Sequence, residues 1–411
     1  MAIKRLLIAN RGEIAVRIIR AAKSMGIHTI QAHSEADAHM LAVRQADEAV
    51  CIGPAQAAQS YLNVEAVVAA AKATQADAVH PGYGFMAENA AFVRALEEAD
   101  ITFVGPSADT IDRMGDKVAA RQAAEAAGVP VVPGSKGRLE TVDDAVSVAA
   151  GLGYPVMIKA AAGGGGKGIR IADNEADLRK MAPQAQAEAK AAFGDGALYL
   201  ACLDEATRQH LCDTAVSLAK AVGYVGAGTL EYLYDSATKE FFFIEMNTRI
   251  QVEHPVTEML TGTDLVQEMI HVAGGGKLRQ SQEDITRSGH AIEVRLNAED
   301  PMMQFLPFPG QVSSLKLPEG DGIRFDHFLY EGYQVPPFYD SLLGKLIVHG
   351  KDRDAAIALM ITALEGLEIG GLKTTKPLHL ALAHDPAVRA DDFHTQWLEP
   401  WLAAGNLKPT P

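Results

Sequence analysis

Short apolar runs alternate with amphipathic helical patterns along the first hundred residues. Strands are predicted at the apolar runs, and a helix is predicted from about Gly12, directly after the first run. The predicted strands are residues 5–9, 29–32, 49–52, 78–80 and 101–104. Because strands that alternate with helices usually pair in parallel, this part is predicted to be an α/β lobe on a mostly parallel sheet. We place its end near residue 115.

The rest of the chain has a mixed pattern. Residues 154–172 read as a strand, a glycine-rich loop and a second strand. A later region is rich in strand patterns and contains a helix from about Arg353 to Leu367. The predicted fold class is therefore α/β and α+β multidomain, with divisions at residues 1–115, 116–200 and 201–411.

Composition narrows the class of protein. A chain of 411 residues, 48% hydrophobic and 22% charged, is typical of a globular protein of two or three domains. Its 37 Lys and Arg against 52 Asp and Glu give a net charge of −15, which argues against non-specific nucleic-acid binding. Every apolar run is shorter than the roughly 18 residues of a membrane helix. The N-terminus carries no secretion signal, and the three cysteines form no C-x-x-C pair, so we expect a cytoplasmic protein.

The glycine-rich loop is a candidate phosphate site. Gly163, Gly165 and Gly168 have G-x-G-x-x-G spacing, but the next segment alternates like a strand, which argues against a dinucleotide fingerprint. Lys167 is followed by glycine, where a Walker A loop needs Ser or Thr. A hairpin loop of unhindered N–H groups, with Lys159 before it and Lys167 in it, suits the covering of phosphates. A plain mobile turn is the alternative.

Two strand-like runs around a polar turn, between Glu231 and Glu245, predict an antiparallel hairpin. If its register centres on the turn, the two carboxylates face each other in apolar surroundings. A bridging Mg²⁺ or Mn²⁺ would then offset their repulsion. A register slip of one residue would instead turn one glutamate to solvent, and the spacing leaves the two interpretations even.

Polar and apolar residues alternate strictly after this hairpin. An extended strand would place Glu245, Asn247, Arg249, Gln251 and Glu253 on one face. At about 13 Å from Glu245 to Arg249, one end could serve a metal and phosphates, and the other end a second substrate. A solvated strand face is the alternative.

Two further residues are candidates from their surroundings. Arg295 lies on an alternating strand and could face the same cleft, although a structural ion pair is the commoner role of a single arginine. Tyr83 follows His80 in a tight loop after a strand, where α/β proteins place ligand sites. A structural turn explains that loop equally well.

Together these segments closely resemble biotin carboxylase, the ATP-grasp subunit of biotin-dependent acyl-CoA carboxylases. The resemblance covers nearly the whole chain in order, with Ala87 and Ala162 as minor departures. It rests on Ile8-Ala9-Asn10-Arg11-Gly12-Glu13-Ile14-Ala15, His80-Pro81-Gly82-Tyr83-Gly84-Phe85, Met114-Gly115-Asp116-Lys117, the Lys159 glycine loop, and the segment from Phe243 to Glu258.

The resemblance implies an N-terminal α/β biotin carboxylase lobe over 1–115, an incomplete ATP-grasp lid over 116–200, and an ATP-grasp core with a C-terminal mixed lobe over 201–411. It implies carboxylation of biotin by ATP and bicarbonate through carboxyphosphate, as the first half-reaction of an acyl-CoA carboxylase, with acetyl-CoA as the expected acyl-CoA. No Met-Lys-Met segment occurs, so biotin would arrive on a biotin carboxyl carrier protein. A carboxyltransferase component and a second copy of the chain are the other expected partners.

The resemblance also implies residue roles. Glu253 would deprotonate bicarbonate, Arg295 would stabilise the biotin enolate, and Tyr83 would line the biotin site. Arg249, Gln251 and Val252 would hold bicarbonate. The magnesium ligands would be Glu231, Glu245 and Asn247. The residues that hold ATP phosphates would be Lys117, Lys159, Gly163, Gly164, Gly165, Gly166, Lys167 and Gly168.

One departure from the family is large. After Leu200 the family continues with an adenine-binding hinge, lid strands, a histidine and a bicarbonate-binding lysine, whereas here Leu200 passes through Ala201 directly to Cys202. Either the chain has a true internal deletion, natural or engineered, or the molecule contains a stretch beyond this sequence. For a molecule of 43.7 kDa we predict no biotin-stimulated ATP turnover. A mass several kilodaltons higher would leave the full mechanism in place.

Two other functions compete with this interpretation. One is a different ATP-grasp ligase, of the carboxylate–amine or carbamoyl-phosphate type, whose ATP cleavage biotin would not stimulate. The other is a non-catalytic form that keeps the dimer and carrier contacts but binds no ATP.

Overall fold

The computed structural model describes residues 3–131, 141–152, 156–159, 169–172, 174–181, 203–235, 238–394 and 397–408. The chain divides into two compact units. Unit 1 is formed by Met1–Asp112, Tyr224–Thr229 and Asn247–Pro411, and unit 2 by Arg113–Gly223 and Leu230–Met246. No helix among the described residues is long and apolar enough to cross a membrane.

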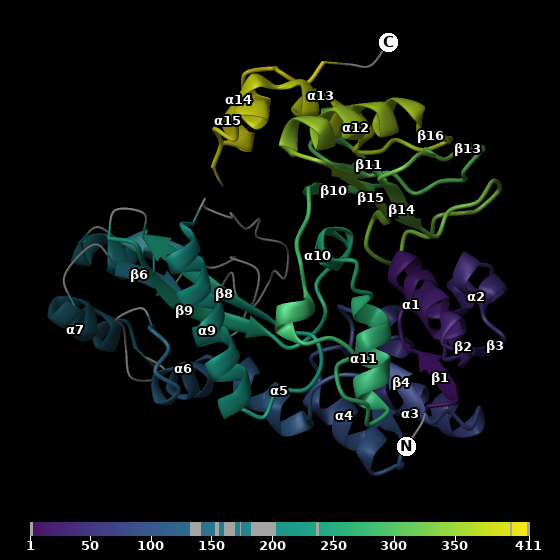
Figure 1. Ribbon diagram of the computed structural model, residues 1–411, viewed down its shortest axis with the longest axis horizontal. Helices are drawn as coiled ribbons and strands as arrows, with labels where there is room; N and C mark the ends of the chain where they lie inside the picture. The colour runs from purple at the N-terminus through teal and green to yellow at the C-terminus, as the bar shows by residue number, and fades with distance from the viewer. Residues whose placement is uncertain are drawn as a thin grey trace. The chain divides into compact units, whose positions relative to one another are not determined.

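Unit 1 begins with a five-stranded parallel sheet of order β3-β2-β1-β4-β5, as predicted (Figure 1). The central strand reads as a continuous apolar run because helices cover both faces of the sheet, and Leu6, Leu7 and Ile8 are fully buried. Its strands are β1 (Arg5–Ile8), β2 (His28–His33), β3 (Glu48–Cys51), β4 (Ala78–His80) and β5 (Thr102–Phe103). The helices that follow them are α1 (Gly12–Ser24), η1 (Glu35–Asp37), α2 (Leu41–Gln45), η2 (Ala57–Gln59), α3 (Val64–Ala73), α4 (Ala90–Glu97) and α5 (Ala108–Gly115).

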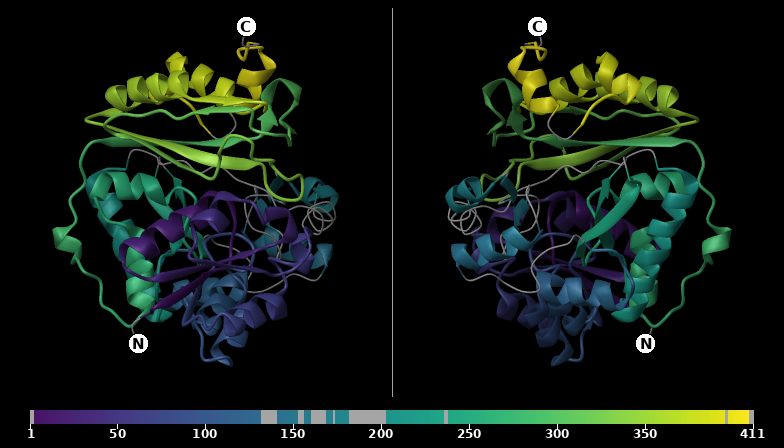
Figure 2. Two further views of the ribbon diagram at one scale, coloured as in Figure 1. Left: turned by 90° about the vertical axis from the view of Figure 1, so that its right-hand side faces the viewer. Right: turned by 90° about the vertical axis from the view of Figure 1, so that its left-hand side faces the viewer.

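The second sheet of unit 1 is antiparallel, with the order β10-β15-β14. Its strands are β10 (His290–Asn297), β14 (Ile323–His327) and β15 (Leu342–Gly350). Helix α12 (Arg353–Gly366), predicted from Arg353 to Leu367, covers one face, and α1 lies against the other (Figure 2). Leu296, Leu346 and Val348 pack against α12. Because side chains alternate along a strand, Arg295 and Lys345 point to the α1 side.

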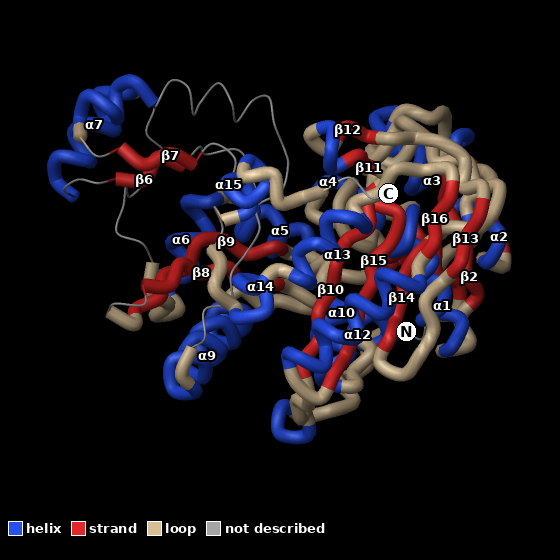
Figure 3. The backbone as a smooth tube through the Cα atoms, turned by 90° about the horizontal axis from the view of Figure 1, so that it is seen from above, coloured by secondary structure: helices blue, strands red, loops and turns tan. Residues whose placement is uncertain are grey.

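The remaining elements of unit 1 connect and extend these sheets (Figure 3). The strands are β11 (Glu299–Asp300), β12 (Leu306–Pro307), β13 (Ser314–Lys316) and β16 (Glu368–Gly370). The helices are α10 (His254–Thr261), α11 (Leu265–Ala273), η3 (Gln282–Asp284), η4 (Pro301–Met303), α13 (Lys376–His384), α14 (Pro386–Ala390) and α15 (Leu398–Ala403).

Unit 2 contains the two predicted hairpins. Strands β6 (Val156–Lys159) and β7 (Ile169–Ala172) pair antiparallel, so the segment after the glycine loop is a strand and the dinucleotide fingerprint is excluded. The other hairpin is β8 (Thr229–Asp235) with β9 (Glu240–Asn247). The helices of this unit are α6 (Lys117–Ala126), α7 (Val142–Leu152) and α9 (Glu205–Ala221).

Candidate active site

The alternating run after β9 is not a single strand, and this part of the prediction is wrong. Strand β9 ends at Asn247, and residues 248–253 form an irregular link to α10. The Thr248 backbone N–H donates to Glu88 Oε1 at 2.9 Å instead of to a neighbouring strand, while Ile250 is buried in the core. The chain therefore leaves the strand pairing at Thr248, where a side chain from another element accepts from the backbone N–H.

Arg249 is the centre of a polar group on this link. Its guanidinium donates to Asn247 Oδ1 at 3.2 Å, to Gln251 Oε1 at 3.2 Å and to Glu88 Oε2 at 2.9 Å. Three of the five residues predicted to share a face are therefore in contact. Contacts on three sides fix the plane of the guanidinium, which suits recognition of a planar oxyanion.

Glu88 was missed at the sequence level. It lies immediately before Asn89, the N-cap of α4, whose side chain accepts a hydrogen bond from the Phe92 N–H at 2.9 Å. The cap fixes where the helix begins, and hence where Glu88 points. The adjacent Glu-Asn pair before an amphipathic helix was the available signal.

Glu253 forms an ion pair with Arg295, which joins two residues predicted to be catalytic. The pair remains reachable from solvent, since the Glu253 side chain is 50% and the Arg295 side chain 35% exposed. The Arg295 backbone carbonyl accepts hydrogen bonds from His379 Nε2 at 2.7 Å and from Thr375 Oγ1 at 3.1 Å. These bonds hold the end of β10 in place, so the pair is mounted on a rigid strand.

Tyr83 belongs to a buried polar cluster behind this pair. Its hydroxyl donates to Glu13, and Glu13 Oε1 lies 3.2 Å from Lys345 Nζ. Burial raises the pKa of Tyr83 well above its usual range, and the Glu13 carboxylate adds to the rise. Burial also raises the pKa of Glu13, against the opposing effect of Lys345.

Lys345 connects this cluster to the predicted bicarbonate residues. It is fully buried, and its ammonium donates to the Val252 carbonyl oxygen at 2.7 Å. Neither Lys345 nor Glu13 was predicted as a site residue. A lysine inside the apolar strand Leu342–Gly350 was the signal for it, because a buried lysine requires partners.

The predicted metal ligands lie on the β8–β9 hairpin, with Glu231 on β8 and Glu245 and Asn247 on β9. Two carboxylates and a carboxamide are hard oxygen donors, so the donor set fits Mg²⁺ or Mn²⁺. Whether the two glutamates face each other stays a prediction.

The predicted phosphate-binding residues divide between described and undescribed segments. Lys117 is the first residue of α6, directly after the N-cap Asp116, whose carboxylate accepts from the N–H groups of Val118 and Ala119. Lys159 ends β6, and its side chain lies outside the described residues. Gly163, Gly164, Gly165, Gly166, Lys167 and Gly168 also lie outside the described residues.

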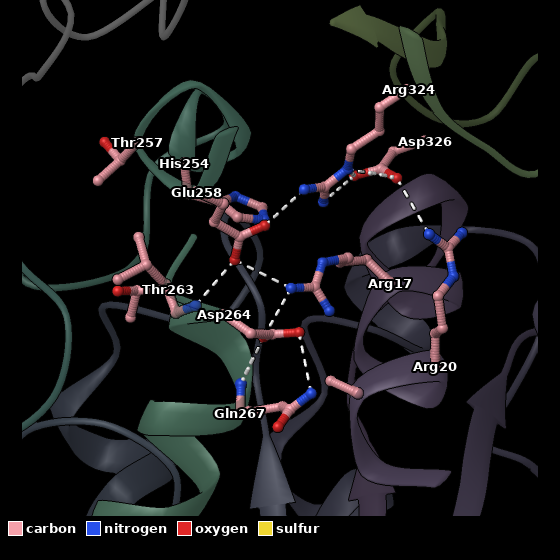
Figure 4. Close-up of polar contacts among 12 residues, drawn as sticks. Arg17, Arg20, His254, Thr257, Glu258, Thr263, Asp264, Gln267, Arg324 and Asp326 are labelled. Carbon is pink, nitrogen blue, oxygen red and sulfur yellow. Dashed lines mark hydrogen bonds and ion pairs between the residues drawn. The ribbon is translucent and has the colours of Figure 1, made fainter. Parts of the chain in front are cut away.

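A second charged cluster holds α10 and the residue before α11 against α1 (Figure 4). Arg17 on α1 contacts Glu258 on α10 at 2.9 Å and Asp264 at 2.7 Å. Glu258 also accepts from Arg324 at 2.7 Å, and Arg324 in turn pairs with Asp326. The cluster borders a cavity of about 440 Å³. Because Glu253 is the N-cap of α10, these ion pairs help to fix its position.

Family models match most of the chain. The biotin carboxylase N-terminal domain matches residues 2–111, and the biotin carboxylase C-terminal domain matches residues 293–400. The ATP-binding domain of the carbamoyl-phosphate synthase L chain matches in two pieces, 116–202 and 200–281. Biotin carboxylase 1 of Bacillus subtilis (strain 168) is 48% identical over 449 aligned residues, covering 98% of this chain and all of that protein.

The chain belongs to the biotin carboxylase family. It is therefore an enzyme, an ATP-grasp ligase. Solved biotin carboxylase structures agree: one from Campylobacter jejuni, a beta-gamma-ATP complex, has TM-score 0.90 and 43% identity and covers 97% of this chain and 99% of its own. The biotin carboxylase domain of the Hydrogenobacter thermophilus 2-oxoglutarate carboxylase, a dimer with MgADP, ADP and bicarbonate, has TM-score 0.91 and 41% identity over the full length of both chains.

The family comparison also bears on the junction after Leu200. The alignment with the Bacillus subtilis biotin carboxylase spans 449 positions, more than the 411 residues of this chain. The ATP-binding family model breaks into two pieces that meet at residues 200–202. Both observations agree with the predicted absence of a stretch at this junction.

Proposed function

We propose that this protein carboxylates biotin on a separate carrier protein, with ATP and bicarbonate as the other substrates. The observation that carries the proposal is the solvent-reachable Glu253–Arg295 ion pair, together with the fixed Arg249 guanidinium on the same link. In this scheme Arg249, Gln251 and Val252 hold bicarbonate, and Glu253 accepts its proton. The bicarbonate oxygen then attacks the γ-phosphorus of ATP, the bond to ADP breaks, and carboxyphosphate forms.

Carboxyphosphate then releases CO₂ and phosphate, and the released phosphate takes the proton from the biotin ring nitrogen. Arg295 stabilises the resulting biotin enolate while CO₂ bonds to that nitrogen, and Tyr83 lines the biotin site. Lys117, Lys159 and the glycine loop with Lys167 hold the ATP phosphates. Glu231, Glu245 and Asn247 would hold Mg²⁺ or Mn²⁺, which would supply positive charge against the phosphates.

The partners in this scheme are a biotin carboxyl carrier protein, a carboxyltransferase component and a second copy of the chain, in the cytoplasm. The Hydrogenobacter thermophilus relative, determined as a dimer, supports the homodimer. Acetyl-CoA is the proposed final acceptor. Formation of malonyl-CoA by the enzyme with its carrier and carboxyltransferase would support that acceptor, and carboxylation of pyruvate or 2-oxoglutarate instead would overturn it.

Intact mass and ATP cleavage test the proposal together. A molecule heavier than 43.7 kDa should cleave ATP in a reaction that requires bicarbonate and is stimulated by free biotin. A molecule of 43.7 kDa should show no such stimulation, and normal carrier binding without ATP binding would identify a non-catalytic deletion form. ATP cleavage stimulated by ammonia or an amine, and not by biotin, would favour a different ATP-grasp ligase.

A further inference from the structure

Glu293 is a buried carboxyl group next to the candidate catalytic pair. It lies two residues before Arg295 on β10, and Arg295 is the register partner of Lys345 on β15. Leu296 and Leu346 pack against α12. Because neighbouring side chains on a strand point to opposite faces, the side chains of Glu293, Arg295 and Lys345 lie on the face away from α12. Among the described residues, no group hydrogen-bonds either carboxylate oxygen of Glu293, and both oxygens are inaccessible to solvent. A buried carboxyl without partners is costly, so this one requires an explanation.

The charges around Glu293 do not balance if every group is ionised. The acids Glu13, Glu253 and Glu293 face the cations Lys345 and Arg295, which gives a net charge of −1, and one added proton restores neutrality. Glu13 Oε1 contacts two donors, Tyr83 and Lys345, and Glu253 is paired with Arg295, so each of these carboxylates has a partner in the structure. Glu293 has no such donor and is the group best suited to hold the proton.

Groups on the neighbouring elements do not change this balance. Asp326 on β14 is paired with Arg324 and Arg20. Burial lowers the pKa of His254 on α10 well below its usual range, so it is neutral at physiological pH. The charged residues of α12 belong to the helix that covers the other face of the sheet. Arg17 is paired with Glu258, which lies on α10, and with Asp264, which is the N-cap of α11.

The electrostatics agree with this assignment. Burial raises the pKa of Glu293 to about 8, with the carboxylates of Glu253 and Glu13 adding to the rise and Lys345 and Arg295 opposing it. The carboxyl is therefore largely neutral at pH 7 and ionises just above it.

We infer that Glu293 is a positioning residue for the proposed carboxylation: it holds a proton, so that Glu253 stays paired with Arg295 and bicarbonate meets no additional anion. This inference rests on the proposed function. At alkaline pH the proton passes to solvent, and the new carboxylate competes with Glu253 for Arg295 and repels the bicarbonate anion. Activity should then fall as Glu293 ionises.

The first test measures the titration of Glu293 without requiring turnover. Both tryptophans, Trp397 and Trp401, lie in unit 1, so the thermal shift of tryptophan fluorescence reports the unfolding of this unit. When the pKa of a carboxyl is higher in the folded protein than in the unfolded chain, the protein loses stability as pH rises from the unfolded pKa to the folded pKa. The melting temperature of Glu293→Gln minus that of the wild type should therefore grow from pH 5 to pH 8 and level off above. Glu365→Gln, an exposed change on α12, is the matched control and should give a flat difference.

The second test asks whether Glu293 senses the catalytic base. In a Glu253→Gln background the negative charge that helps to raise the pKa of Glu293 is gone. The difference in melting temperature between the variants with and without Glu293→Gln should therefore level off at a lower pH. A flat curve in the first test would show that Glu293 holds no proton. A curve that does not move in the Glu253→Gln background would show a buried acid uncoupled from the base. Either result overturns the inference.

A kinetic readout separates this inference from the proposed function. The rate of biotin-stimulated ATP cleavage is measured against pH for the wild type and for Glu293→Gln, and each profile is normalised to its own maximum. The rate should fall above pH 8 for the wild type and fall less for Glu293→Gln. Identical profiles would contradict the inference alone. A wild type without biotin-stimulated cleavage at any pH would contradict the proposed function for this molecule, while the melting curves would still decide whether Glu293 is coupled to Glu253.

Discussion

At the scale of single residues, the site depends on a few charges whose partners come from distant parts of the chain. Glu13 and Lys345 are 332 positions apart in sequence (345 − 13) and lie within 3.2 Å of each other. Lys345 in turn supports the Val252 carbonyl beside Glu253. The side chains predicted to do chemistry are therefore held by side chains that do none.

Replacing Lys345 with methionine should destabilise unit 1. The substitution keeps the length of the side chain but leaves Glu13 buried without its cation, and breaking a buried pair in this way costs about 3–5 kcal/mol. Denaturant unfolding followed by tryptophan fluorescence measures the loss. Adding Glu13→Gln should restore part of the stability, because it removes the unpaired charge; a double variant as unstable as the sum of both singles would contradict this explanation.

Glu253→Gln should reduce bicarbonate-dependent ATP cleavage by roughly 10²- to 10⁴-fold, the usual contribution of a general base. The amide keeps the size of the side chain and can still contact Arg295, so the fold should survive. Steady-state ATP cleavage at saturating bicarbonate measures the change in kcat. Glu283→Gln, an exposed substitution in η3, is the control, and an equal loss in both variants would refute the assignment.

At the scale of elements, helix starts determine where site residues point. Asn63 caps α3 and Asn89 caps α4, each through a hydrogen bond to the N–H three residues on. Only the α4 cap adjoins a site residue, Glu88, which contacts Arg249. Two helices with the same cap therefore differ in their connection to the site.

This difference gives a matched pair of variants. Asn89→Ala and Asn63→Ala should each cost about 1 kcal/mol of stability through loss of the cap. Only Asn89→Ala should also raise the KM for bicarbonate, because Glu88 then holds the Arg249 guanidinium less firmly. Unfolding curves and KM measured on both variants test this. A KM that rises equally in both would indicate a general effect of destabilisation.

At the scale of the whole molecule, buried histidines make stability depend on pH. Burial lowers the pKa of His80 to about 3 and that of His327 to about 4, with Arg17 and Arg20 respectively adding to the shift. Unfolding exposes both rings to water, where their pKa is about 6.5. The unfolded chain therefore binds more protons than the folded protein between about pH 4 and pH 6.5.

Stability should consequently fall as pH decreases through that window. From pH 7 to pH 5 each histidine should account for a loss on the order of 1–2 kcal/mol. Denaturant unfolding at the two pH values measures the total, and His327→Gln should make the dependence shallower. A dependence unchanged in that variant would mean that His327 is not buried in its neutral form.

Much of the fold followed from local pattern. The prediction included the five parallel strands, the hairpin on either side of the glycine loop and the helix from Arg353. These elements could be predicted because the spacing of apolar residues and the turn residues between the elements indicate them directly. The strand predicted from Glu245 to Glu253 was wrong beyond Asn247, because Glu88, 160 residues away from Thr248, takes the backbone donor that a strand would need. The division of the chain at residues 115 and 200 stays a prediction.

The sequence by itself determined the family, the class of enzyme and the candidate residues, because motifs such as the segment from Phe243 to Glu258 place characteristic side chains at fixed spacing. Only the tertiary structure decided which of these residues meet. It paired Glu253 with Arg295, surrounded Arg249 with Glu88, and placed Lys345, Glu13 and Glu293 behind them. The physical reason is that a charge is stabilised in the interior by partners brought near in space, and no local pattern records which distant segments the fold brings together.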